Sequence, residues 1–210
     1  MKTMRVIVLI SLATFLFGCA SFQAGSDISA GRQALLTGNS EAALSYFQRA
    51  AQRDPNYIYG ATYRQGVWSY VGRAEYATGK LPQARQTLER ALAANRDEYL
   101  ARLYLGLTLA REGDRQNGLK EIEGGMKGIY DWLEYVTFTT RYGQFWDPRR
   151  EIRSDIEKNL AMLSAKEVDL QRVITNGESL GTRMETEIDL AYRDEHTDMT
   201  TDGSGSAEPN

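Results

Sequence analysis

Small and bulky apolar residues recur along the chain at helical spacing, and the same five positions occur in three successive repeats. In each repeat a glycine is followed after seven residues by a second glycine, and then by a small, a bulky apolar and another small residue at intervals of five, four and three. These positions are Gly31, Gly38, Ala43, Phe47 and Ala50 in the first repeat, Gly72, Gly79, Ala84, Leu88 and Ala91 in the second, and Gly106, Gly113, Gly118, Ile122 and Gly125 in the third. The first two repeats are 41 residues apart and the last two 34.

Each repeat predicts a pair of antiparallel helices joined by a tight turn. The second glycine suits a left-handed turn, and the small residues let the two helices approach closely. Asn39 or Ser40 can cap the helix after the first turn, and Pro82 suits the first turn of its counterpart. The seven extra residues between the first two repeats predict a helix about two turns longer. Because one hairpin cannot bury its apolar face alone, we expect the three hairpins to stack.

The pattern resembles the tetratricopeptide repeat (TPR), which has a 34-residue period. The residues that carry the resemblance are Gly31, Ala43, Phe47, Ala50 and Pro55 in the first repeat, Trp68, Gly72, Ala84 and Ala91 in the second, and Leu105 and Gly106 in the third. The resemblance implies an all-α fold, a short TPR-type solenoid of about three hairpins over residues 26–129, with units near 24–57, 65–98 and 99–132. In the third unit Tyr130 replaces the terminal proline, so its second helix is expected to run on.

The segment after the repeats predicts capping helices for the exposed end of the solenoid. Residues 130–193 begin with an aromatic stretch and continue with apolar residues at helical spacing. Asp147 and Pro148 predict an N-cap and a first-turn proline. Gly177 and Gly181 predict a break or bend, so this segment forms either one helix or two. Residues 194–210 predict a disordered acidic tail, because no basic residue follows Arg193.

The N-terminus has the pattern of a secretion signal. Two basic residues precede an apolar run of 12 residues, 6–17, which is shorter than the roughly 20 that span a membrane. The run ends in Leu16-Phe17-Gly18-Cys19, which resembles the lipobox of bacterial lipoproteins. The resemblance implies cleavage after residue 18, lipidation of Cys19 (palmitate-type acyl chains) and a short tether over residues 19–25. The alternatives are a buried free cysteine and ordinary cleavage after Gly18 or Ala20.

The same resemblance implies a location. Ala20 stands where the inner-membrane retention signal of these lipoproteins has aspartate. The expected place is therefore the outer membrane, facing the periplasm, or the cell membrane if the source has a single membrane. The partners implied are the membrane itself, through Cys19, and a periplasmic or outer-membrane protein.

The amino-acid composition and net charge exclude several classes of function. The 210 residues carry a formal net charge of −3, which disfavours a general nucleic-acid binder, since such proteins present a basic face. One His and one Cys leave no His-based metal cluster, no internal disulfide and no credible base for a catalytic triad. We therefore expect no metal, no cofactor, no nucleic acid and no enzymatic activity. A glycan-cleaving enzyme that uses a pair of carboxylates is the least implausible catalytic alternative.

Two sets of residues are candidates for binding a partner. In the family that the chain resembles, ligands lie along a concave wall of first helices, which would here present Arg32, Arg73, Tyr76, Leu107 and Arg111. Two guanidinium groups at equivalent places, Arg32 and Arg73, could hold carboxylates. Tyr59 and Tyr63, on the lengthened helix, are the second set, since tyrosine is a favoured interface anchor. The alternatives are solvated arginines and tyrosines that pack between helices.

These features predict a non-catalytic scaffold: a membrane-anchored lipoprotein that mediates a protein–protein interaction in the assembly of an envelope complex. The alternative is an accessory lipoprotein that handles a small molecule or lipid for a transport system. An enclosed apolar cavity would favour this alternative, whereas an open groove would favour the scaffold. The basic residues Arg149, Arg150 and Arg153 have acidic neighbours and are expected to form a solvated helix face.

Overall fold

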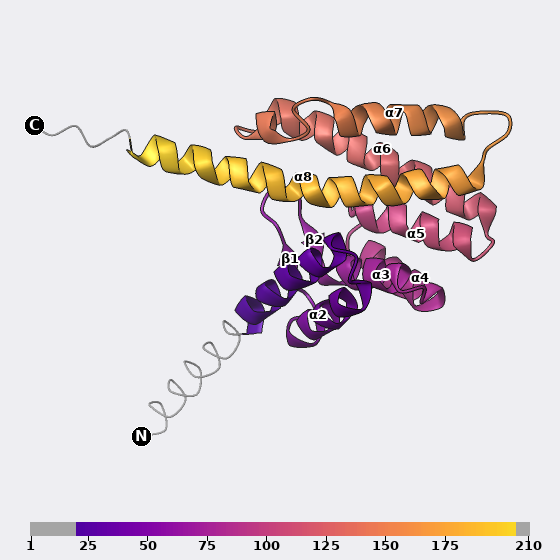
Figure 1. Ribbon diagram of the computed structural model, residues 1–210, viewed down its shortest axis with the longest axis horizontal. Helices are drawn as coiled ribbons and strands as arrows, with labels where there is room; N and C mark the ends of the chain where they lie inside the picture. Colours follow the sequence, from indigo (N-terminus) through magenta and orange to yellow (C-terminus); the bar gives the residue numbers. More distant parts are fainter. Residues whose placement is uncertain (1–19, 205–210) are drawn as a thin grey trace, which may run out of the picture. The chain divides into compact units, whose positions relative to one another are not determined.

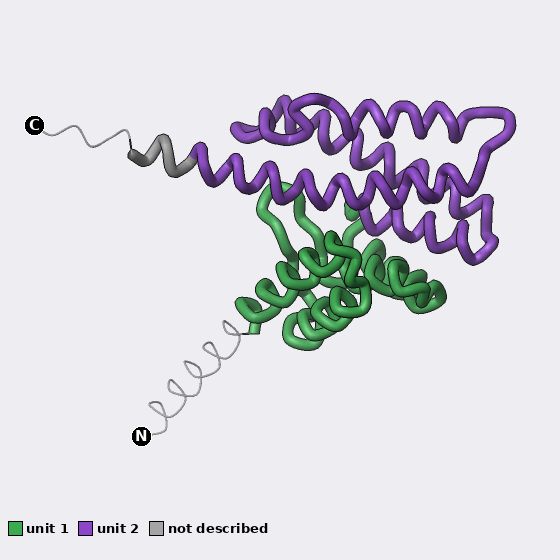
Figure 2. Tube along the Cα trace, viewed as in Figure 1, with its two compact units in different colours: residues 1–98 green, residues 99–210 purple. Residues whose placement is uncertain are grey.

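The computed structural model describes residues 20–204, with side chains over residues 20–198, and divides into two compact units. Unit 1 is Met1–Glu98 and unit 2 is Tyr99–Asn210 (Figure 2). Unit 1 contains a helix over residues 20–36, α2 (Ser40–Arg53), β1 (Ile58–Tyr59), β2 (Gln65–Gly66), α3 (Val67–Ala77) and α4 (Leu81–Ala94). Unit 2 contains α5 (Tyr99–Arg111), α6 (Arg115–Thr139), a 3-10 turn (Gly143–Phe145), α7 (Glu151–Leu163) and α8 (Leu170–Ser204) (Figure 1). The predicted all-α, solenoid-type fold is confirmed.

The glycine and the bulky residue of each repeat pack against each other across the two helices of one hairpin. A Cβ added to Gly31 would lie 2.4 Å from the Phe47 ring, and one added to Gly72 would lie 2.6 Å from Leu88. The same relation joins Gly106 and Ile122 in α5 and α6. Phe47 also reaches the next hairpin, since its ring centroid lies 5.2 Å from that of Tyr70. The repeat thus encodes one close contact that occurs three times.

The turns inside the hairpins follow the prediction. Gly38, Gly79 and Gly113 have φ angles of 80°, 75° and 95°, a region that favours glycine. The Asn39 side chain caps α2 by accepting a hydrogen bond from the Ala42 amide, and Pro82 lies in the first turn of α4. The predicted tether is wrong for residues 20–25, which are already helical, because Ala24 is fully buried in the core of unit 1.

The extra residues between the first two repeats do not lengthen a helix, and this expectation is wrong. They form a turn and a two-stranded antiparallel hairpin in which Ile58 pairs with Gly66 and Tyr59 with Gln65. Asp54 starts the turn by accepting a hydrogen bond from the Asn56 amide, and Gly60 has a φ of 92°. Since Pro55 and a left-handed glycine both oppose a helix, α3 begins only at Val67.

In unit 2 the third hairpin packs with α7 and α8 (Figure 1). As expected, α6 runs on past residue 130, to Thr139. The predicted break at Gly177 and Gly181 is wrong, because α8 is one continuous helix whose two glycines make room for Leu107 and Tyr104 of α5. The predicted disordered tail is wrong for residues 194–204, which belong to α8; residues 205–210 lie outside the described part of the chain.

The segment between α6 and α7 is held by buried aromatic and charged side chains. Trp146 is fully buried, with its ring centroid 4.8 Å from that of Trp132, and its Nε1 donates to the Glu195 carboxylate of α8 at 2.9 Å. Asp147 is not the N-cap residue that the sequence predicts, since α7 begins at Glu151. Its carboxylate nevertheless caps this helix, by accepting hydrogen bonds from the amides of Ile152 and Arg153 at 3.0 Å.

Candidate binding sites

Arg32 and Tyr59, two predicted partner-binding residues, contact each other inside unit 1. Nη1 of Arg32 donates to the Tyr59 hydroxyl at 3.2 Å, and the guanidinium lies 5.0 Å from the centre of the tyrosine ring. Arg32 is only 4% exposed, so it does not offer an open guanidinium to a carboxylate. The contact ties the β-hairpin to the helix over residues 20–36.

Arg73 has the same kind of role on α3. Its Nη1 donates to Gln65 Oε1 at 2.9 Å, and Gln65 in turn donates to the Tyr70 hydroxyl at 2.8 Å. Arg73 is 1% exposed, and Tyr63 and Tyr76 are also buried. The expectation of an exposed wall with two arginines is therefore wrong, since the chain uses both guanidinium groups to hold its own hairpin in place.

The other two predicted wall residues, Leu107 and Arg111, also contact other parts of the chain. Leu107 is fully buried, beneath Gly177 of α8. Arg111 is partly exposed and forms an ion pair with Glu178 of α8. Partner binding by any of these seven residues stays a prediction. Cys19, the predicted lipidation site, lies outside the described residues.

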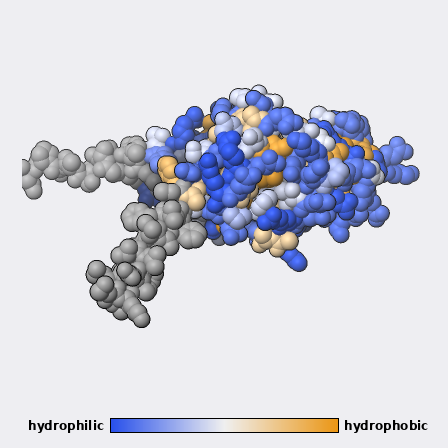
Figure 3. Space-filling view, turned by 90° about the horizontal axis from the view of Figure 1, so that it is seen from below, coloured by the Kyte–Doolittle hydropathy of each residue, from blue (hydrophilic) through white to orange (hydrophobic). Residues whose placement is uncertain are grey.

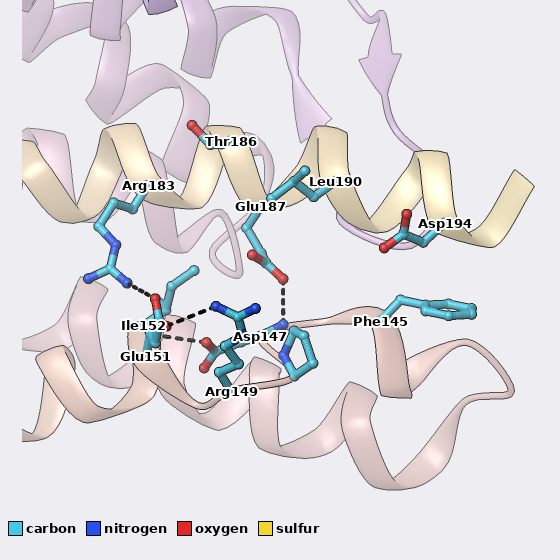
Figure 4. Close-up of a pocket in the computed structure, with 11 residues that line it drawn as sticks. Phe145, Asp147, Arg149, Glu151, Ile152, Arg183, Thr186, Glu187, Leu190 and Asp194 are labelled. Carbon is cyan, nitrogen blue, oxygen red and sulfur yellow. Dashed lines mark hydrogen bonds and ion pairs between the residues drawn. The ribbon is translucent and has the colours of Figure 1, made fainter. Parts of the chain in front are cut away.

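A cavity of about 440 Å³ lies in unit 2 between α8 and the segment that leads into α7 (Figure 4). We call it the α7–α8 cavity; its lining includes Phe145 and Leu190 and six charged residues, Asp147, Arg149, Glu151, Arg183, Glu187 and Asp194. Figure 4 shows Glu187 directed at the Asp147 amide, which donates a hydrogen bond to it, and Arg183 directed at Glu151. Burial raises the pKa of Glu187, although the hydrogen bond from the Asp147 amide and the charge of Arg183 counteract this in part.

The backbone beside this cavity is strained. Asp147 and Arg150 have φ angles of 46° and 56°, which non-glycine residues rarely adopt. The strain is held by a buried ion pair, since Arg153 Nε donates to the Asp147 carboxylate at 3.0 Å and both side chains are at most 3% exposed. Glu151 pairs with both Arg149 and Arg183, and this charged lining suits a rigid junction better than a pocket for a lipid chain.

A second cavity, of about 470 Å³, lies in unit 1 beside the β-hairpin. We call it the hairpin cavity; the side chains that matter most for its chemistry are Tyr57, Ile58, Arg64, Trp68, Arg90 and Glu98. The turn after α2 brings them together, because Trp68 Nε1 donates to the Pro55 carbonyl at 2.8 Å and the Val67 amide to the Tyr57 carbonyl at 2.9 Å. Ile58 is 48% exposed, which is unusual for an isoleucine in a packed domain.

In the hairpin cavity the positively charged side chains are exposed and the negatively charged one is buried. Arg64 and Arg90 are exposed, and the Arg90 guanidinium lies 3.5 Å from the centre of the Trp68 ring. Glu98 is buried, and it accepts a hydrogen bond from the Gly66 amide at the start of α3. Burial raises the pKa of Glu98, although the Gly66 amide, the Ser69 hydroxyl and the charge of Arg73 counteract this in part. A ligand would meet an apolar and aromatic wall with cations around it.

The hairpin cavity does not follow from the sequence pattern. Pro55 and Gly60 are the residues that indicate it, since they disfavour the continuous helix predicted to carry Tyr59 and Tyr63. The face drawn in Figure 3 is mostly hydrophilic, with separate small hydrophobic areas. Within residues 20–198, whose side chains are described, no group of three or more His, Cys, Asp or Glu side chains is arranged to hold a metal ion. None of the described helices is both long and apolar enough to cross a membrane.

Comparison with known families gives one match. Residues 34–106 match the family model of the tetratricopeptide repeat, which is about a third of the chain and spans α2 to α5. Comparison with curated proteins and with solved structures yields no significant match. TPR repeats mediate binding to protein partners and are typically non-catalytic. The match and the three glycine-packed hairpins together support a protein that contains TPR-type repeats.

Proposed function

We propose that this protein is a lipid-anchored, periplasm-facing scaffold that binds a protein partner during assembly of an envelope complex. The hairpin cavity carries the partner-binding part of the proposal. Tyrosine, tryptophan and arginine dominate the energetics of protein interfaces, and Tyr57, Trp68, Arg64 and Arg90 line this one cavity. The membrane part rests on the sequence around Cys19, since the only cysteine of the chain lies two positions after the apolar run.

The capture of a partner tests the cavity. A photoreactive residue in place of Ile58, introduced in cells of the source organism, is expected to cross-link one recurrent envelope protein. Arg64→Glu should reduce this capture about tenfold, because reversing a charge at the rim of an interface disfavours the complementary partner. The yield of the cross-linked species, measured by mass spectrometry, is the readout.

Arg85→Glu is the matched control for that experiment. Arg85 is an exposed arginine of the same unit, on α4, and it does not line the hairpin cavity. It should leave capture nearly unchanged. Equal losses from the two substitutions would place the binding surface elsewhere, and small-molecule adducts alone would favour the accessory role in transport.

Replacement of Cys19 tests the anchor. Cys19→Ser should abolish incorporation of labelled fatty acid and shift the protein from the membrane to the soluble fraction, because the acyl chains are attached through the cysteine sulfur, which serine lacks. A Cys19→Ser protein that still incorporates labelled fatty acid would rule out the lipid anchor at this residue.

A further inference from the structure

The first turn of the helix over residues 20–36 exposes a large aromatic side chain. Phe22 is 81% exposed, more than the exposed Phe138, at 76%, or Tyr135, at 65%. Packing fixes its direction: Ala24 and Ile28 are fully buried, and the Ser21 hydroxyl donates to the Asp54 carboxylate at 2.8 Å. Phe22 therefore faces away from unit 1.

The exposed side of this helix also carries no formal charge. Phe22, Ser26, Ser29 and Gln33 lie on one helical stripe, at intervals of four, three and four residues, and all are exposed. The two charged residues of the helix, Asp27 and Arg32, are buried. Asp27 accepts hydrogen bonds from both Arg49 and Arg53 of α2. By contrast, α2 and α4 expose Glu41 and Arg85.

Phe22 lies three positions after Cys19 in the chain. This distance is about 4.5 Å along a helix axis and about 10 Å even for a fully extended chain. The polar layer of a bilayer is roughly 5–8 Å thick on each side, from the difference between its total and hydrocarbon thickness. A lipid on Cys19 would therefore hold Phe22 within reach of the acyl chains.

We propose that the first turn of this helix contacts the lipid surface, and that Phe22 inserts at the boundary of the acyl chains as a second apolar contact beside the lipid on Cys19. This inference rests on the proposed lipid anchor. The transfer of an exposed aromatic ring from water to this boundary is favourable in free energy. A helix face without charged residues can approach the boundary without the cost of removing water from an ion. The contact would hold unit 1 at a defined place on the membrane, where a lipid alone would leave it free to rotate.

A fluorescent label at position 22 tests the contact. Because the only native cysteine is Cys19, a Phe22→Cys substitution gives the mature lipoprotein one free thiol. The full mature protein is labelled there with a nitrobenzoxadiazole dye and reconstituted in vesicles of phosphatidylethanolamine and phosphatidylglycerol that contain a nitroxide-labelled lipid. We expect a blue-shifted emission and loss of most of the fluorescence to the nitroxide.

Phe138→Cys is the matched control, since Phe138 is an equally conspicuous exposed phenylalanine, at 76%, on α6 of unit 2. A second pair of variants tests whether the ring itself maintains the contact. The label on a Ser26→Cys protein should be quenched in the wild-type and Phe22→Trp backgrounds, and it should lose its quenching with Phe22→Asp. Because position 22 is exposed, circular dichroism is expected to show the same fold in all three.

The outcomes separate the two proposals. Equal quenching at positions 22 and 138, or none at position 22, in a protein whose Cys19 is lipidated would overturn the contact and leave the anchor standing. Unchanged quenching at Ser26→Cys with Phe22→Asp would also overturn it. Mass spectrometry that finds Cys19 unmodified would overturn both the contact and the anchor.

Discussion

Replacement of Arg153 by methionine is expected to lower the free energy of unfolding of unit 2 by about 3–5 kcal/mol. Arg153 is 1% exposed and donates to the Asp147 carboxylate, to the Asp147 carbonyl and to Glu134. Without the guanidinium, the Asp147 carboxylate would stay buried with no cation beside it, in a segment whose backbone is already strained. The loss should therefore exceed that of an ordinary ion pair.

Urea denaturation followed by tryptophan fluorescence measures this effect. A Trp68→Phe background leaves Trp132 and Trp146, the two remaining tryptophans, both of which report on unit 2. Arg149→Met is the matched control, because Arg149 comes from the same segment but is 85% exposed and lies 3.9 Å from its Glu151 partner. It should change the free energy by less than about 1 kcal/mol. Equal effects of the two substitutions would contradict the assigned role of Arg153.

Two adjacent glycines of α6 are expected to respond to alanine with opposite signs. A Cβ on Gly125 would lie 2.5 Å from the Leu103 amide nitrogen and 2.7 Å from its Cα, which are backbone atoms of α5 and cannot move aside. Gly125→Ala should therefore destabilise unit 2 by about 1–3 kcal/mol, as overpacking of a close interface does. The better helix propensity of alanine offsets only about 1 kcal/mol of such a cost.

Gly124 gives the control. Its added Cβ would meet only the flexible Arg102 side chain, at 3.2 Å, so Gly124→Ala should stabilise unit 2 by up to about 1 kcal/mol. The same urea titration measures both variants. Stabilisation by Gly125→Ala would show that α5 and α6 are not in the close contact described above.

The sequence predicts the hairpins well, because their determinants are local. The five repeated positions lie within 20 residues of one another, and each one follows from helix periodicity or from a left-handed turn. The departure of the third repeat from the TPR pattern has a structural reason. Gly118 and Gly125 replace alanines where α6 lies against the backbone of α5, so even a methyl group would collide.

The candidate sites are predicted poorly, because side-chain burial depends on contacts between distant residues. Arg32 and Arg73 occupy equivalent positions on two first helices, and this spacing alone suggests a pair of exposed guanidinium groups. In the structure both arginines donate hydrogen bonds to the β-hairpin, Arg32 to the Tyr59 hydroxyl and Arg73 to Gln65 Oε1. The prediction for Arg153 is wrong for the same reason. Its charged neighbours predict a solvated helix face, but the side chain is buried against Asp147.

The sequence by itself determined the three helical hairpins and their turns, because each depends on residues that are close in the chain. It also carries the lipobox-like ending of the N-terminal apolar run. Only the tertiary structure decided that the residues after α2 form a strand pair beside a cavity, that α8 continues through Gly177 and Gly181, and which arginines are exposed. These features depend on which other segments each segment packs against. Trp146 and Glu195, for example, are hydrogen-bonded although they are 49 residues apart, and such a contact leaves no periodic signal in the sequence.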